Sequence, residues 1–249
     1  MSGHNKWSSI KHKKAVTDAK KGKVFAKVIK EIVLATKEGG QQIENNARLR
    51  KAIEDAKEIN MPQNNIKKAI QRGSGETSEK TEEIIYEGYG PTGVAVIVKV
   101  TTNNKNRTAS NIRKIFLNYG GNLGEVGCVS WMFSKKGYIT VNKSVSNEEV
   151  IMNIVLDAGA EDFKSSINSN VYEIITSPLN FEMVKKSLEE KNILFAFAEI
   201  TMLPQTRIIL TDDNAVLMLK FINELKEYAD VRDVYANFDI SNKNMEKIK

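Results

Sequence analysis

The sequence has very few of the residues that build metal and disulfide sites, with one cysteine and two histidines among 249 residues. Cys128 has no second cysteine to pair with, so nothing indicates an oxidising compartment. Metal sites need several converging histidine, cysteine or carboxylate ligands. His4 and His12 both lie in a lysine-rich segment that would repel a divalent cation. We therefore expect no metal site.

Long apolar runs are missing as well. The best one, residues 94–98, has the length of a strand, whereas a transmembrane helix needs about 20 apolar residues. The first residues, MSGHNKWSSIKHKK, lack the apolar core of a signal peptide. These absences predict a cytoplasmic protein that does not enter a membrane.

Catalytic motifs are scarce. The sequence contains no GxxxxGK[ST] phosphate loop, and both histidines lie in a polar tail, where they would make poor bases for a serine or cysteine nucleophile. Gly88, Gly90 and Gly93 match the GxGxxG string of dinucleotide sites, but a β-branched strand follows them where that site requires a helix, and Pro91 removes an N–H donor. A hairpin turn is the better interpretation. We expect neither an enzyme nor a cofactor nor a small-molecule substrate.

Positive charge is unevenly distributed along the chain. Residues 1–73 hold 17 Lys and Arg against 7 Asp and Glu, whereas residues 74–249 hold 20 against 24. The formal net charge of the whole chain is +6. This asymmetry points to a polyanion partner for the basic part, either nucleic acid or an anionic membrane surface.

Three helices are predicted in the basic part, at residues 15–38, 47–59 and 62–72, with Gly73 as the terminator of the third. In the first helix, Phe25, Val28, Ile29 and Ile32 share one arc and several lysines occupy the opposite arc. A membrane-surface helix would have to free this apolar stripe, which the two other helices need for their core. Nucleic acid is therefore the better partner, and residues 1–14 are expected to order on contact with it.

The candidate nucleic-acid-binding residues are the cations of this part, together with an aromatic and a histidine in the tail. Each Lys or Arg that contacts a phosphate contributes affinity by releasing counterions. Trp7 either stacks on an unpaired base or anchors the tail to the domain. No set of base-reading side chains is evident. The candidates are Lys6, Trp7, Lys11, His12, Lys13, Lys14, Lys20, Lys21, Lys23, Lys27, Lys30, Arg48, Arg50, Lys67, Lys68 and Arg72.

A secondary anion site is predicted where Asn104, Lys105, Asn106 and Arg107 open a helix. A helix N-terminus with amide and basic groups suits an anion. Plain capping by Asn104 or Asn106 explains the same residues equally well.

The pattern changes beyond residue 83, where strands begin to alternate with helices. A β-α-β-β-α-β order over the third quarter is typical of a ferredoxin-like unit, and the helix and strand after residue 210 would complete the segment before it. The fold class is therefore α+β, a three-helix domain followed by two ferredoxin-like α/β domains, one inserted in the other. The expected domains are residues 1–78, residues 79–134 plus 205–249, and residues 135–204, with strands at 84–87, 94–101, 129–133, 137–141, 161–165, 171–176, 196–202, 207–210 and 231–238 and helices at 106–118, 148–158, 180–190 and 213–228.

Four stretches resemble the YebC/PmpR family over essentially the whole chain. They are GHNKWSSIKHKK from Gly3, NMPQNNI from Asn60 with AIQRG from Ala69, YEGYGPTGV from Tyr86, and NRT from Asn106 followed by GGNLG from Gly120; VYANFDI from Val234 also fits. The departures are small: Asn5 and Cys128 replace common serines, and Asn103 replaces a common aspartate. This last change puts in doubt any role of a carboxylate at the predicted anion site.

The resemblance implies three domains and a non-enzymatic role in gene expression. Bacterial members of the family are described mostly as DNA-binding transcriptional regulators. Related mitochondrial proteins activate the translation of cytochrome c oxidase, and some bacterial members are linked to the ribosome. The prediction is thus a DNA-binding transcriptional regulator, with a translation factor that binds ribosomal RNA as the alternative. A scaffold whose acidic residues 74–249 recruit a protein partner is a third hypothesis.

Overall fold

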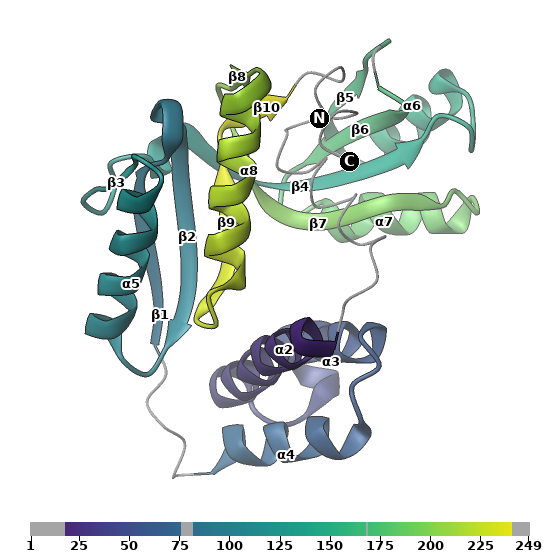
Figure 1. Cartoon of the computed structure of the whole chain (residues 1–249). Helices are drawn as coiled ribbons and strands as arrows, with labels where there is room; N and C mark the ends of the chain where they lie inside the picture. The colour runs from purple at the N-terminus through teal and green to yellow at the C-terminus, as the bar shows by residue number, and fades with distance from the viewer. Residues whose placement is uncertain (1–17, 76–81, 168, 241–249) are drawn as a thin grey trace.

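The computed structural model describes residues 18–75, 82–167 and 169–240. It shows a helical part followed by two antiparallel sheets, each carrying helices on one face (Figure 1). The predicted α+β fold class is confirmed. Among the described residues, no helix is long and apolar enough to span a bilayer.

The helical part consists of α2 (Asp18–Gly39), a short 3₁₀ turn η1 (Ile43–Asn45), α3 (Ala47–Glu58) and α4 (Gln63–Ser74). The predicted apolar stripes form its core, in which Ile32, Leu49 and Ile66 are buried. Asn46 caps α3 by accepting a hydrogen bond from the backbone N–H of Leu49 at 2.9 Å. The apolar stripes of the three helices thus pack against one another within the helical part.

Gly73 does not terminate α4 as predicted, because the helix continues to Ser74. A Cβ at Gly73 would lie 2.6 Å from both the Thr36 side chain and the Val33 carbonyl of α2. The glycine is therefore required for the close approach of α4 to α2 rather than for a helix end.

The first sheet has the strand order β3-β1-β2-β9. A central hairpin pairs two strands directly, and the last strand of the sheet comes from a segment more than a hundred residues later. Val96, Val98 and Val100 point to the helices on one face, where the Phe116 and Phe221 rings meet edge to face at 5.0 Å. The elements are β1 (Glu82–Tyr89), η2 (Pro91–Gly93), β2 (Ala95–Thr102), α5 (Lys105–Asn118), β3 (Asn122–Leu123), α8 (Asp212–Glu227) and β9 (Val231–Ala236).

The second sheet has the order β5-β6-β4-β7, the strand order of a ferredoxin-like unit. Its core lies between the sheet and two helices and includes Ile139, Ile174 and Val184. The elements are β4 (Phe133–Asn142), α6 (Glu148–Asp157), β5 (Ala160–Ser165), β6 (Val171–Thr176), α7 (Phe181–Glu190) and β7 (Phe195–Pro204). All of them lie in the chain between β3 and α8, so the second sheet is inserted into the first. The boundaries 1–78, 79–134 plus 205–249, and 135–204 remain a prediction.

The end of the chain adds a short parallel pair, β8 (Ile208–Leu210) with β10 (Phe238–Ile240). The predicted strand at residues 129–133 was wrong, because a 3₁₀ turn, η3 (Ser130–Met132), occupies most of it and β4 begins at Phe133. The carboxylate of Glu87 accepts hydrogen bonds from the backbone N–H groups of Val129 and Ser130. Those donors are consequently not available to a strand ladder.

Candidate nucleic-acid interface

The predicted binding residues fall into groups that differ in how much of each residue the structure describes and in what the side chains contact. Lys6, Trp7, Lys11, His12, Lys13 and Lys14 lie outside the described residues. Lys20, Lys21 and Lys23 lie in the first turns of α2, where the structure describes the backbone but not the side chains. The described side chains on α2, α3 and α4 show which cations are exposed and which contact the protein itself.

Lys27 and Lys30 of α2 turn toward the first sheet. The Lys27 ammonium donates a hydrogen bond to the backbone carbonyl of Lys226 at the end of α8. The Lys30 ammonium lies 2.6 Å from Asp230 and donates to the Ala229 carbonyl at 3.4 Å. Both cations therefore join the helical part to the loop between α8 and β9.

Arg48 of α3 is surrounded by carboxylates. Its guanidinium lies 2.8 Å from Glu31, 2.5 Å from Glu38 and 2.5 Å from Glu83 of β1. Burial opposes the charge on Arg48, but hydrogen bonds to Glu31 and Glu83 outweigh it and raise its pKa. The charge of Arg48 is thus neutralised within the molecule.

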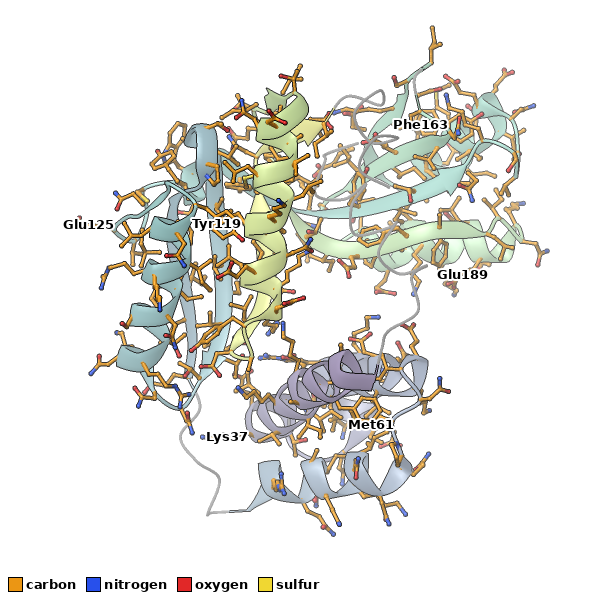
Figure 2. All side chains as sticks on the ribbon, viewed as in Figure 1. Lys37, Met61, Tyr119, Glu125, Phe163 and Glu189 are labelled. Carbon is orange, nitrogen blue, oxygen red and sulfur yellow. The ribbon has the colours of Figure 1, made fainter. Side chains whose placement is uncertain are left out.

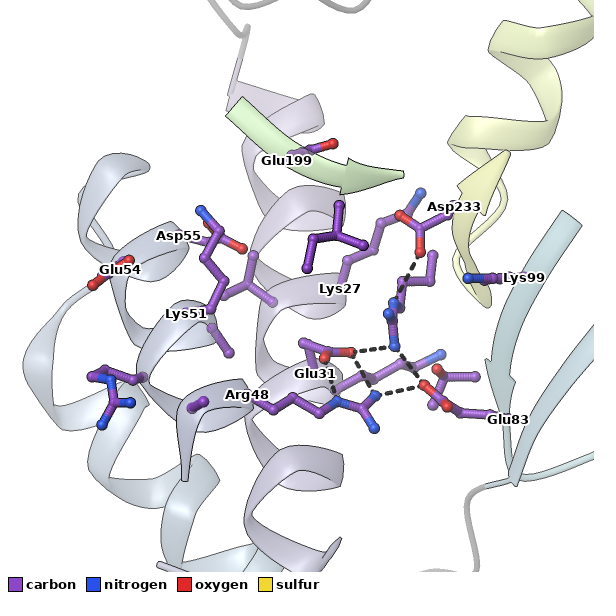
Figure 3. A pocket seen from close by; sticks show the side chains of 18 of the residues that line it. Lys27, Glu31, Arg48, Lys51, Glu54, Asp55, Glu83, Lys99, Glu199 and Asp233 are labelled. Carbon is purple, nitrogen blue, oxygen red and sulfur yellow. Dashed lines mark hydrogen bonds and ion pairs between the residues drawn. The ribbon is translucent and has the colours of Figure 1, made fainter. Parts of the chain in front are cut away.

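Arg232 of β9 shares two of the same carboxylates, at 3.3 Å from Glu31 and 2.5 Å from Glu83 (Figure 3). Two arginines and two glutamates from four elements therefore form one network across the junction. The core of the helical part and the core of the first sheet are separate clusters. Docking of the helical part consequently relies on polar contacts.

Asp230 anchors this junction from the side of the sheet. Its carboxylate, 5% exposed, accepts hydrogen bonds from the hydroxyls of Thr108 at 2.7 Å and Thr102 at 3.2 Å and pairs with Lys30. Burial alone would raise the pKa of Asp230, but the hydrogen bonds from Lys30 and Thr108 lower it below the usual value. Asp230 therefore stays ionised and holds both the sheet and the helical part.

The predicted secondary anion site is a capped helix start. Asn104 accepts a hydrogen bond from the backbone N–H of Arg107 at 3.0 Å, so its side chain serves as the N-cap of α5. The Arg107 guanidinium lies 3.4 Å from Asp230. Lys105 and Asn106 are exposed. The arrangement supports the capping interpretation, while anion binding there remains a prediction.

The cations of α4 differ from those of α2 and α3. Lys67, Lys68 and Arg72 are exposed, and within the described residues no hydrogen bond or ion pair engages them. Side chains tipped with nitrogen project from α4 on the side away from the sheets (Figure 2). Arg50 of α3 lies between these two groups of cations in its contacts. It is exposed, but its guanidinium donates hydrogen bonds to the backbone carbonyls of Ile43 and Glu44 at 2.9 Å.

A cleft of about 1280 Å³ lies where the helical part meets both sheets (Figure 3). Glu199 of β7 projects into it and remains accessible to water, yet enclosure by the surrounding protein, and secondly the charge of Asp233, raise the pKa of Glu199 to about 7. Lys99 of β2 lies across the cleft with its ammonium 5.1 Å from the centre of the Tyr235 ring. Burial lowers the pKa of Lys99. The sequence analysis did not identify Glu199 or Lys99. Each is the single charged residue of its strand, and this pattern could have indicated it.

Metal binding finds no support among the described residues, which contain no group of three or more His, Cys, Asp or Glu side chains arranged to hold an ion. His4 and His12 lie outside them.

We expect the docking of the helical part to be salt-sensitive. The double substitution Glu83→Gln and Arg232→Gln keeps the net charge and removes the pairs of Glu83 with Arg48 and of Arg232 with Glu31. Partly exposed pairs contribute about 0.5 kcal/mol each, so the undocked population should rise about fivefold. Small-angle X-ray scattering over a NaCl series should show expansion at a lower salt concentration than in the wild type.

The matched control is Lys186→Gln with Glu190→Gln, which removes a pair within α7 at 3.7 Å. This control should expand at the wild-type salt concentration. Identical scattering of the two double variants would contradict docking through the Arg48–Glu83 and Arg232–Glu31 pairs.

The amino-acid sequence matches the models of one protein family. Residues 5–76 match the family model of the TACO1/YebC protein N-terminal domain, and residues 81–238 match the model of the TACO1/YebC second and third domain. A relative from Endomicrobium trichonymphae, named a probable transcriptional regulatory protein, is 66% identical over 249 residues, which are 100% of this chain and 99% of the relative. One of the same name from Elusimicrobium minutum is 52% identical over 250 residues, covering 100% and 99%.

A solved structure is similar as well. The crystal structure of a conserved hypothetical protein from Aquifex aeolicus superposes with a TM-score of 0.78 at 46% identity, covering 94% of this chain and 96% of that one. The arrangement of helices and sheets described above is therefore shared with an experimentally determined relative.

Proposed function

Because the chain belongs to the TACO1/YebC family, whose curated relatives are named probable transcriptional regulatory proteins, we propose that it is a cytoplasmic, non-enzymatic transcriptional regulator that binds DNA. The binding surface is the outer face of α4, and the lysine-rich residues 1–23 of the same basic part of the chain supply further positive charge. Residues 74–249, which form the two sheets, carry a net negative charge, and their surface is available to a protein partner.

One observation carries this proposal, namely the different use of the cations in the helical part. Lys27, Lys30 and Arg48 are engaged by carbonyls and carboxylates of the protein itself. The cations of α4 are exposed, and the whole of α4, QNNIKKAIQRGS, contains no acidic residue. A helix face with positive charge and no internal counter-charge is suited to phosphates.

The test is binding to duplex DNA by the triple substitution Lys67→Gln, Lys68→Gln and Arg72→Gln. Each lost phosphate contact lowers the slope of log K against log salt by about 0.9, so the slope should fall by about 2.7. We expect affinity at moderate salt to fall at least about tenfold. Fluorescence anisotropy across a NaCl series measures both quantities.

The control triple, Lys114→Gln, Lys186→Gln and Lys191→Gln, changes the net charge equally but lies on α5 and on or just after α7. Equal losses in both triples would contradict direct contacts of α4. In cells, crosslinking followed by sequencing of all recovered nucleic acid should enrich discrete promoter regions. Enrichment of one ribosomal RNA neighbourhood would replace the DNA-binding proposal by a translation role.

A further inference from the structure

The exposed face of α4 carries amide side chains as well as cations, and the two kinds lie on different lines along the helix. Successive residues of an α-helix are rotated by about 100°, so residues seven apart lie on the same line along the helix, about 10 Å apart. Asn64 and Gln71 are seven residues apart, and both are exposed. They form an amide line along α4.

This amide line follows the crest of the exposed face. Gly73, whose Cα lies against α2, is nine residues from Asn64 and therefore points in the opposite direction. The other buried residues of the helix, Ile66 and Ala69, also face α2 and α3. Asn64 and Gln71 thus lie on the line of α4 that points most directly away from the rest of the domain.

Cations flank the amide line on both sides. Relative to Asn64, Lys67 is rotated about 60° one way, while Lys68 is rotated about 40° and Arg72 about 80° the other way. All three side chains are exposed. A crest of amides with one cation on one side and two on the other matches the cross-section of a nucleic-acid groove, where base edges lie between two phosphate strands.

The major groove of B-form DNA is the groove that fits. It is about 12 Å wide and admits an α-helix, and none of the described helices and strands covers the outer side of α4 (Figure 1). The major groove of A-form RNA is too deep and narrow for such a helix. Asparagine and glutamine pair with adenine through two hydrogen bonds in the major groove.

We propose that α4 is a recognition helix for the DNA major groove, in which Asn64 and Gln71 each read an adenine and Lys67, Lys68 and Arg72 hold the flanking phosphates. The inference rests on the proposed DNA-binding function and adds the residues that read sequence. Since base pairs rise by about 3.4 Å, the two adenines stand about three base pairs apart.

The test is selection of binding sites from a library of randomised DNA duplexes, carried out with the full-length protein. The wild type should enrich two A·T pairs about three base pairs apart. Asn64→Ala should lose the preference at one position and Gln71→Ala at the other, each by about tenfold against the remaining bases. The salt slope of binding should stay unchanged in both, because neither side chain carries charge.

The control is Gln41→Ala, which removes an exposed amide between α2 and α3 and should leave the selected sequence unchanged. Circular dichroism checks that the variants retain their helices. If the wild type binds duplexes and the variants select the same sequence as the wild type, or if no sequence is selected, the recognition helix is refuted while DNA binding stands. If the wild type binds no duplex at all, the proposed function itself fails and the inference with it.

Discussion

Glu87→Ala should lower the free energy of unfolding by about 3 kcal/mol, because it leaves one buried and two partly buried backbone donors without an acceptor. The Glu87 carboxylate is 3% exposed and accepts hydrogen bonds from the backbone N–H groups of Gly127 at 2.8 Å, Val129 at 3.0 Å and Ser130 at 2.7 Å. Urea denaturation followed by circular dichroism measures the loss. Glu82→Ala, an exposed change on the same strand, should cost little.

The contribution of Glu87 should also depend on pH. Burial would raise the pKa of Glu87, but the three backbone hydrogen bonds outweigh it and lower the pKa below the ordinary value. A carboxylate with a depressed pKa stabilises the fold above its unfolded pKa of about 4.3, and that stability is lost as the pH falls below this value. The stability difference between wild type and Glu87→Ala should therefore shrink below about pH 4. A difference that stays constant down to pH 2.5 would contradict this account.

Asp230→Ala should cost about 3 kcal/mol as well, and it should also loosen the helical part. The hydroxyls of Thr102 and Thr108 lose their acceptor and Lys30 loses its counter-ion. Lys30 is partly exposed and regains water, so most of the cost falls on the buried threonines. Thermal and urea denaturation measure the stability, and small-angle scattering measures the docking.

Two further variants separate these effects. Asp230→Asn keeps an acceptor for the threonines and removes the charge, so it should be milder in stability but still undock at lower salt. Asp157→Ala, an exposed change at the end of α6, should alter neither property. Because the pKa of Asp230 is lowered, its contribution is lost as the pH falls below the unfolded value of about 3.9. Full retention of docking in Asp230→Ala would show that Lys30 is not a significant link.

Most helices and strands could be predicted from the apolar residues, because the helices bury one face each and the central strands are short apolar runs. The stripe of Ile32 in α2 lies in a core as expected, and the apolar run around Val96 and Val98 in β2 is buried on both faces of the sheet. The segment at residues 129–133 failed for a physical reason. Its valine, tryptophan and phenylalanine look like a strand, but the buried carboxylate of Glu87, some forty residues earlier, takes the backbone donors that a strand would use.

The positive charge of the candidate site could be predicted from the sequence, but the groups that its cations contact could not. Helical spacing correctly placed Lys27 and Lys30 on one face of α2, yet it could not show that this face meets Asp230 and the end of α8, two hundred residues later. The exposure of Lys67 and Lys68 was expected. The crest formed by Asn64 and Gln71 was also within reach of helical spacing, once Gly73 was known to point inward and not to end the helix.

The insertion of one sheet into the other sets the order in which the chain can fold during synthesis. The β1–β2 hairpin is made early, but its neighbour β9, whose Ala236 pairs with Val96, is the last strand of this sheet to emerge from the ribosome. The contiguous helices and the second sheet can fold as they appear, whereas β2 waits with an open, strongly apolar edge. We therefore expect completion of the first sheet, which needs this long-range pairing, to be the slow step of folding. A translational pause between β2 and α8 would prolong the period in which that edge is open to aggregation or to a chaperone.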